Sequence, residues 1–220
     1  MASGSKRPVF KYGSGPAPST REMRPGLTDS IYDSIALHSG NCDRETILRA
    51  VVKDGLALDW AAEVCKGDPD IVMAAVKQNG HALRYAANSC REDRAIVAQA
   101  VAENGWALEW AADGLRHDRE IVLVALKENG LALKVAADSC KADRDLVFTA
   151  VKQDWRAIEW AAEPLRSDRE LVLLAVQQGS RALQWAADEL LDDSDFAREA
   201  KQDVYIFKIS LLSGRSCSIA

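Results

Sequence analysis

The sequence is poor in the residue types that carry enzyme chemistry. Its 220 residues include only 3 histidines and 5 cysteines. His38, His81 and His117 share no spacing typical of metal ligands, and no serine or cysteine lies in a recognisable nucleophile motif. These absences predict a protein that is not an enzyme, that uses no metal or other cofactor, and that has no small-molecule ligand.

Long apolar runs and an excess of basic charge are also missing. The longest hydrophobic segments fall far short of the roughly 20 residues that a membrane-spanning helix needs. The chain has 28 Lys and Arg against 33 Asp and Glu, a net charge of −5, so nucleic acid is not an expected partner. An odd number of cysteines without a secretory signal predicts reduced thiols and an intracellular, most simply cytoplasmic, location.

The dominant feature that is present is a unit of 25 residues, seen most plainly over residues 118–142, which occurs six times without an insertion. Aspartate recurs at this step, at Asp43, Asp68, Asp93, Asp118, Asp143, Asp168 and Asp193. A pair of alanines recurs at the same step, beginning at Ala61 and Ala62. A fixed period of this length is typical of stacked repeat arrays, in which neighbouring units bury each other's apolar faces.

Each unit is predicted to form two short helices of about 10 residues. The aspartate is a suitable N-cap for the first helix. The Asn-Gly pairs that follow predict that this helix ends with glycine in the left-handed conformation. The second helix has apolar residues at i, i+3, i+4 and i+7, for example Leu58, Ala61, Ala62 and Cys65. Its alanine pairs are expected to let neighbouring helices approach closely.

The predicted fold is therefore all-α, with a short β-hairpin at the C-terminus. Residues 43–192 are expected to form a right-handed, solenoid-like stack of six 25-residue helix-turn-helix repeats. Residues 28–42 keep a weak helical pattern and are expected to form an N-terminal capping helix, while residues 193–203 are expected to form a partial capping repeat. Residues 204–220 have the alternating pattern and Ser-Gly turn of a β-hairpin.

The first 27 residues have a different composition. Residues 1–27 are rich in serine, glycine, proline and basic residues, with Glu22 as the single acid. This composition predicts a disordered basic tail. Organelle import is the alternative, since targeting peptides are also poor in acids, although the prolines interrupt an amphipathic helix. A third interpretation is a segment that becomes ordered on a partner.

Charged residues and cysteines form columns at the repeat spacing. One column alternates in sign and is predicted to link neighbouring units by ion pairs: Asp59, Arg84, Glu109, Lys134, Glu159 and Gln184. A basic column consists of Arg44, Arg94, Arg119, Arg144 and Arg169. It is expected to pair with a nearly all-acidic column: Glu63, Asn88, Asp113, Asp138, Glu163 and Asp188. Leucine alternates with Cys65, Cys90 and Cys140 at one position, which predicts a buried apolar slot.

Several positions agree in every copy of the unit. A capped aspartate, I/V-V-x-x-A-V-K-x-N-G and L-x-W/Y-A-A, as in residues 55–62, resemble the helical repeat family catalogued as domain of unknown function 4116. That family's unit is about twice as long, so the resemblance implies three family units within residues 43–192, a helical repeat fold and no particular activity. Trp155 and Ser180 replace the glycine in two copies, so the turn is expected to differ there. Residues 204–220 resemble the first hairpin of a ubiquitin-like fold.

One position changes character more than any other between copies. It is occupied in turn by Leu56, His81, Trp106, Leu131, Arg156 and Arg181. A position that the scaffold leaves free to vary is available for recognition, and aromatic and arginine side chains dominate interface hot spots. This position, together with Trp155, is therefore the predicted partner-binding surface.

The predicted function is a non-catalytic protein-interaction or scaffolding module, or an accessory subunit of a larger assembly. Its partner is expected to be a protein, because extended repeat surfaces suit large partners. One alternative is a repeat-containing fragment of a larger multidomain protein, either an enzyme or a ubiquitin-like adaptor. A nucleic-acid-binding helical repeat is the other alternative, which the acidic balance argues against.

Overall fold

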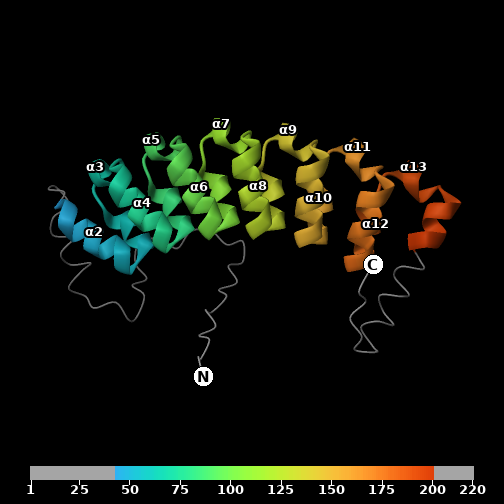
Figure 1. Ribbon diagram of the computed structural model, residues 1–220, viewed down its shortest axis with the longest axis horizontal. Coiled ribbons are helices and arrows are strands. Elements are labelled where there is room, and N and C mark those ends of the chain that lie inside the picture. The colour runs from blue at the N-terminus through green and yellow to red at the C-terminus, as the bar shows by residue number, and fades with distance from the viewer. Residues whose placement is uncertain (1–42, 201–220) are drawn as a thin grey trace, which may run out of the picture.

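The computed structural model describes residues 43–200. Within this range every regular element is helical, and the helices stack into an arch (Figure 1). The principal contacts join each unit to its neighbours, which confirms an all-α solenoid of repeats. The predicted tail at 1–27, capping helix at 28–42 and β-hairpin at 204–220 lie outside the described residues.

Each unit contains three helices. The first is an α-helix of 10 residues: α2 (Arg44–Lys53), α4 (Pro69–Gln78), α6 (Arg94–Glu103), α8 (Arg119–Glu128), α10 (Arg144–Gln153) and α12 (Arg169–Gln178). The second is a 3₁₀ helix of six residues: η1 (Gly55–Trp60), η2 (Gly80–Tyr85), η3 (Gly105–Trp110), η4 (Gly130–Val135), η5 (Trp155–Trp160) and η6 (Ser180–Trp185). The third is an α-helix of four residues: α3 (Glu63–Lys66), α5 (Asn88–Arg91), α7 (Asp113–Arg116), α9 (Asp138–Lys141), α11 (Glu163–Arg166) and α13 (Asp188–Leu191).

These units are numbered one to six, beginning at residues 43, 68, 93, 118, 143 and 168. After unit six, residues 194–200 are helical and fall within the predicted partial capping repeat. The four-residue helices lie along the outer, convex edge of the arch, and the 10-residue helices run from there toward the inner edge (Figure 1). We call the 10-residue helices the long helices and the four-residue helices the short helices.

The long helices begin as the sequence predicts. The side chain of Asp118 accepts hydrogen bonds from the backbone N–H groups of Glu120 and Ile121, at 2.9 and 3.2 Å. Asp68, Asp93, Asp143 and Asp168 also accept from the first turn of their helices. These bonds satisfy donors that have no partner inside the helix.

The prediction that each unit has one continuous second helix is wrong. It is divided into a 3₁₀ helix and a short α-helix by the alanine pair, and Ala61 and Ala62 are extended, with ψ near 151° and 152°. The extended link lets the backbone bond across units: the N–H of Ala87 donates to the carbonyl oxygen of Lys66 at 2.9 Å. The alanines are therefore small because the backbones meet there, and they do not bring two helix axes together.

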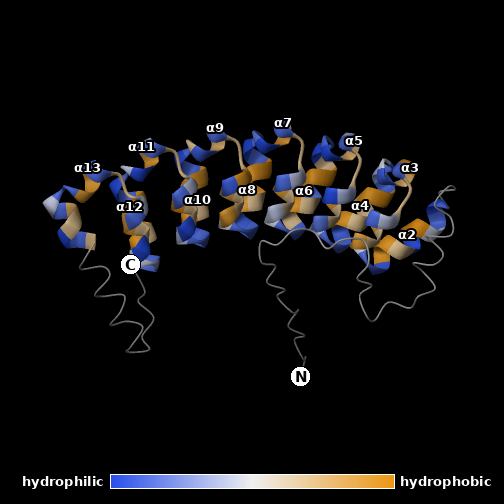
Figure 2. Cartoon of the chain, turned by 180° about the vertical axis from the view of Figure 1, so that it is seen from behind, coloured by the Kyte–Doolittle hydropathy of each residue, from blue (hydrophilic) through white to orange (hydrophobic). Residues whose placement is uncertain are grey.

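A single apolar core runs through the stack. In unit two it takes Ile71, Val72, Ala75 and Val76 from the long helix, and the 3₁₀ helix adds Leu83. Figure 2 shows hydrophobic residues on each long helix, whereas hydrophilic residues are prominent along the outer edge. The core is thus shared between neighbouring units, as expected for units that cannot bury an apolar face alone.

The cysteine position is buried, as predicted. Cys65, Cys90 and Cys140 are all at most 3% exposed. Cys90 and Cys140 are free thiols, and burial raises the pKa of both. Cys65 takes part in a disulfide, so the prediction of reduced cysteines is wrong for this residue.

The glycine that follows each long helix has a different role from the one predicted. Gly55, Gly80, Gly105 and Gly130 do not have a positive φ. A Cβ atom at position 105 would lie 2.4 Å from the carbonyl oxygen of Ala125 in the next unit. Glycine is required because two backbones approach closely there, and not because the chain turns into the left-handed conformation.

Unit five departs from this packing. Trp155 stands in place of the glycine, and Gly179 of unit six stands where earlier units have Asp or Asn. A Cβ atom at position 179 would lie 2.6 Å from Cε2 of Trp155, so the indole ring occupies the space that the glycine leaves. α12 also packs less closely on α10 than the other long helices pack on their neighbours.

Candidate functional site

The turn between the long helix and the 3₁₀ helix presents the variable position. The residue before the 3₁₀ helix is Asp or Asn in units one to five, and its side-chain oxygen accepts the N–H of the residue two places later at 2.9–3.0 Å. That residue is Leu56, His81, Trp106, Leu131 or Arg156. The same hydrogen bond therefore fixes the backbone while the side chain changes from unit to unit.

These side chains form one row, which we call the inner-edge row: Leu56, His81, Trp106, Leu131, Arg156 and Arg181. The turn that carries them follows the long helix at the inner edge of the arch (Figure 1). The first four side chains are half-buried and the two arginines are exposed, while Trp155 beside the row is half-buried. The structure thus places all seven predicted residues along one edge.

His81 also contributes to packing between units. Its Nε2 lies 2.7 Å from Nδ2 of Asn104, and its ring centroid lies 5.0 Å from that of Trp110, in an edge-to-face arrangement. Burial lowers the pKa of His81 below its ordinary value. The ring therefore tends to stay neutral near pH 7.

The inner-edge row becomes cationic toward the end of the stack. Arg156 pairs with Asp154, with Nη2 and Oδ2 at 2.5 Å, and this carboxylate raises the pKa of Arg156. Arg181 forms no ion pair with a residue in 43–200. Lys152 stands at the end of α10 close by in the chain and is exposed. Lys152, Arg156 and Arg181 against Asp154 leave this part of the edge with net positive charge.

The outer surface of the 3₁₀ helices carries the aromatic and alternating-charge columns. Trp60 is 51% exposed, while Tyr85, Trp110, Trp160 and Trp185 are half-buried against the core. Lys134 lies over the ring of Trp160, 5.9 Å from its centroid. Within residues 43–200, no ion pair joins members of the alternating-charge column. The predicted pairing along that column is wrong, because its cations contact aromatic rings.

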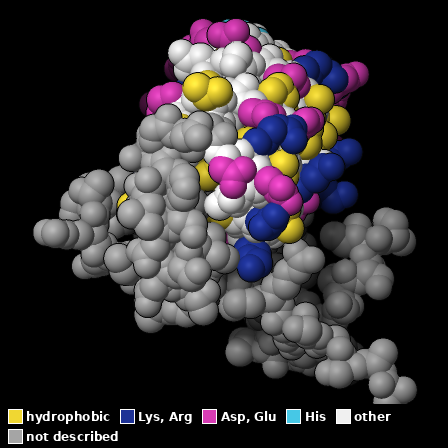
Figure 3. All heavy atoms as spheres, turned by 90° about the vertical axis from the view of Figure 1, so that its left-hand side faces the viewer, with side chains coloured by type: hydrophobic (Ala, Val, Ile, Leu, Met, Phe, Trp, Pro, Cys, Tyr) yellow, Lys and Arg dark blue, Asp and Glu magenta, His cyan; other side chains and the backbone are white. Residues whose placement is uncertain are grey.

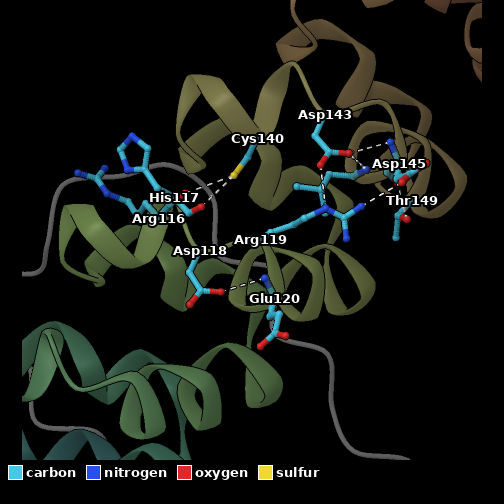
Figure 4. A network of polar contacts seen from close by, with 10 residues as sticks. Arg116, His117, Asp118, Arg119, Glu120, Cys140, Asp143, Asp145 and Thr149 are labelled. Atoms are coloured by element: carbon cyan, nitrogen blue, oxygen red, sulfur yellow. Dashed lines mark hydrogen bonds and ion pairs between the residues drawn. The ribbon is translucent and has the colours of Figure 1, made fainter.

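The basic column pairs with different acids from those predicted. Nε of Arg119 lies 2.9 Å from Oδ2 of Asp143, and its Nη2 lies 3.0 Å from Oδ2 of Asp145 (Figure 4). Both acids belong to the first turn of the next long helix. Arg44, Arg94, Arg144 and Arg169 likewise bind the capping aspartate of the next unit. We call this series the arginine ladder.

The acidic column that was expected to bind these arginines pairs within its own unit. Glu63 pairs with Lys66 at 3.0 Å, and Asp138 pairs with Lys141 at 3.3 Å. Both partners are three residues apart on a short helix, so they face each other without crossing between units. Figure 3 shows acidic and basic side chains next to one another on the described surface at the first-unit end.

A signal for the true partners was present in the sequence. Unit two has Pro69 where the other units have arginine, and unit three has Ala95, 26 residues later, where the other units have an acid. Donor and acceptor are thus lost together. This paired loss between adjacent units identifies the acid that the arginine of the ladder binds.

One shallow hollow of about 240 Å³ lies between α7 and α9. Asp113, Arg116 and His117 line it from one unit, and residues 135–139 line it from the next. Arg116 binds Asp113 at 2.8 Å, and Sγ of Cys140 lies 3.8 Å from the carbonyl oxygen of Arg116 (Figure 4). Within residues 43–200 no group of three or more His, Cys, Asp or Glu side chains could hold a metal ion.

The family model described as Domain of unknown function (DUF4116) matches residues 43–91, 93–141, 118–166, 143–191 and 168–209. Every match begins at a capping aspartate of a long helix, and successive matches from residue 93 onward are offset by one unit. The chain belongs to the DUF4116 family. A DUF4116 unit spans two of the 25-residue units, as predicted, but it fits in five overlapping positions where three consecutive ones were expected.

No curated protein and no solved structure matches the chain. None of the described helices is long and apolar enough to cross a membrane. The DUF4116 assignment therefore agrees with the helical repeats and leaves the activity to be inferred from the surfaces of the stack.

Proposed function

We propose that the protein is a non-catalytic interaction module that binds a protein partner along the inner edge. The observation that supports this proposal is the hydrogen-bonded turn of units one to five, which holds the variable residue in one backbone conformation. Variation at a fixed backbone position provides recognition without a cost in folding. Repeat proteins use such edges to bind extended partners.

The side chains of the inner-edge row suggest the chemistry of the partner. Units one to four offer Leu56, His81, Trp106 and Leu131, which are half-buried and mainly apolar. The next two units offer the exposed Arg156 and Arg181. A segment with apolar residues at one end and acidic residues at the other would complement this order. Trp106 is the expected anchor, because tryptophan is enriched among hot-spot residues.

Site-specific photo-crosslinking in native cells tests the proposal. A crosslinker at position 106 is expected to capture a defined partner protein, whereas one at position 139, on α9 at the outer edge, is not. The double variant Trp106→Ala, Arg156→Ala should lose that partner while circular dichroism shows an unchanged fold. Equal capture from both positions, or only RNA, would contradict the proposal.

A further inference from the structure

The solvent-facing side of the last three long helices carries an apolar patch, in which Thr149 of α10 takes the position that Val124 and Leu174 have on the other two helices. It consists of Leu123 and Val124 on α8, Phe148 on α10, and Leu173 and Leu174 on α12, and we call it the long-helix patch. Val124 is 37% exposed, and the other four side chains are half-buried and cover the core from outside. α8 packs on α10 and α10 packs on α12, so the patch crosses three adjacent helices.

The packing of the repeat does not require apolar side chains at two positions of the patch, whereas Leu123, Phe148 and Leu173 fill a position that is apolar in every unit. Val124 and Leu174 occupy the position that holds Arg49 in unit one and Gln99 in unit three. Arg49 is exposed, and its unit has the same long helix. Polar side chains are therefore compatible with the fold at this position. A concentration of apolar residues where the scaffold accepts polar ones is typical of an interaction surface.

The basic side chains on the two sides of the long-helix patch differ in whether they form ion pairs. On one side, Arg119, Arg144 and Arg169 are bound to acids of the next unit. On the other side, one helical turn beyond Leu123 and Phe148, stand Lys127 and Lys152. Neither lysine forms an ion pair with a residue in the described range. Glu128 adjoins Lys127, but α10 and α12 end in uncharged glutamines. The unpaired charge beside the patch is therefore mainly positive.

We infer that the long-helix patch binds an acidic amphipathic helix that lies across α8, α10 and α12. Packed helices lie about 8–10 Å apart, and seven residues of an α-helix rise about 10.5 Å. Apolar residues at a seven-residue spacing would therefore meet one long helix each. An extended strand repeats its face about every 6.7 Å and does not match this spacing. Glutamates on one flank of the ligand helix would face Lys127 and Lys152.

This surface contains no side chain of the inner-edge row, although Lys152 lies beside both, so its occupant goes beyond the function proposed above. The probe is a synthetic helical peptide of roughly 18 residues, with leucine at every seventh position and glutamates on one flank. Its binding to the full chain is measured by fluorescence anisotropy. Matched peptides carry lysines in place of the glutamates, or the same residues in scrambled order.

Two variants with matched controls identify the surface. Val124→Gln with Leu174→Gln should weaken binding of the acidic peptide about tenfold, equivalent to about 1.4 kcal/mol. The control Ala74→Gln places the same residue at the same helix position outside the patch and should have no effect. Lys127→Glu with Lys152→Glu should also weaken binding, whereas Lys77→Glu, in the same column but outside the patch, should not.

Three outcomes would overturn the inference. The first is equal binding of the acidic and basic peptides, and the second is unchanged binding by the Val124→Gln, Leu174→Gln variant. The third is self-association: if sedimentation shows a dimer that this variant dissociates, the patch binds a second copy of the chain and not an acidic helix. Loss of partner capture at Trp106 would leave all three measurements unaffected, so the two proposals fail independently.

Discussion

At the scale of single residues, the capping aspartate has two partners, one for each carboxylate oxygen. In Asp118, Oδ1 accepts the N–H groups of its own helix, and Oδ2 accepts from Nε of Arg94 at 3.0 Å. One side chain therefore starts a helix and joins it to the preceding unit. This double use explains why aspartate, and not asparagine or serine, caps the helix at the five positions that face an arginine of the preceding unit: Asp68, Asp118, Asp143, Asp168 and Asp193.

The two contacts of Asp118 can be separated by substitution. We expect Asp118→Ala to lower the free energy of unfolding by about 1–2 kcal/mol, because it removes the cap as well as the ion pair. Arg94→Ala removes only the exposed ion pairs with Asp118 and Glu120 and should cost clearly less. Urea denaturation followed by circular dichroism measures both. Equal losses would mean that the cap contributes nothing.

The same carboxylates predict how stability depends on pH. The hydrogen bond from Arg94 holds the pKa of Asp118 below its ordinary value of 3.8, and Arg144 does the same for Asp168. A folded-state pKa below the unfolded value stabilises the fold above that unfolded value, and this stability is lost as the pH falls through the folded pKa. The urea midpoint should therefore decline below about pH 4.

Arg94→Ala with Arg144→Ala provides the control for this pH dependence. Without the two guanidinium groups, the pKa values of Asp118 and Asp168 should rise toward their ordinary range, and the decline in acid should become shallower. The prediction fails if the variant and the wild type lose stability in parallel.

At the scale of the elements, the sequence predicts the long helices better than the second half of the unit. An aspartate before an apolar helical pattern has one reasonable interpretation. The pattern of Leu58, Ala61, Ala62 and Cys65 suits a continuous α-helix, and alanine favours one. The hydrogen bond from the N–H of Ala87 to the carbonyl oxygen of Lys66 in the preceding unit stabilises an extended link in place of a continuous helix. Because this bond joins two units, the hydrophobic periodicity within one unit does not reveal it.

The sequence picked out the inner-edge row but not the partners of the arginine ladder. Variation between copies picked out the inner-edge row, and the hydrogen-bonded turn accounts for it. Pairing of the basic column with acids was predicted, but the wrong acids were chosen: Arg119 binds Asp143 and Asp145 at the start of the next long helix and no residue of the predicted acidic column. A comparison of adjacent units would have identified these acids, because unit two lacks the arginine at Pro69 and unit three lacks the acid at Ala95.

Two glycines test the close approach of backbones. Gly105→Ala should destabilise the protein by about 1–3 kcal/mol, since the added methyl group would meet the carbonyl oxygen of Ala125. Gly114→Ala in α7 meets nothing within 4 Å, and we expect it to stabilise by up to about 1 kcal/mol. Thermal or urea unfolding of the pair provides the comparison. Similar effects at both positions would contradict the role assigned to Gly105.

At the scale of the whole molecule, contacts between neighbours make the stack divisible at the repeat boundary. Deleting residues 118–142 removes one whole unit and brings Arg94 to Asp143, and Gly105 to the carbonyl oxygen of Ala150, as in the intact ladder. We expect this variant to keep its helical circular dichroism spectrum and to unfold at a lower urea concentration. Deleting only residues 118–129 breaks these pairings and should abolish cooperative unfolding.

The exchange between Trp155 and Gly179 bears on how a chain of similar units finds its own order. A repeat protein risks joining the wrong neighbours during folding, by skipping a unit or by taking one from another molecule. The indole of Trp155 needs a glycine opposite it, and the other units carry Asp or Asn at the position of Gly179. Only unit six fits against unit five. This one irregular junction therefore marks a single position along an otherwise uniform chain, and a stack that joined another unit to unit five would contain a steric clash.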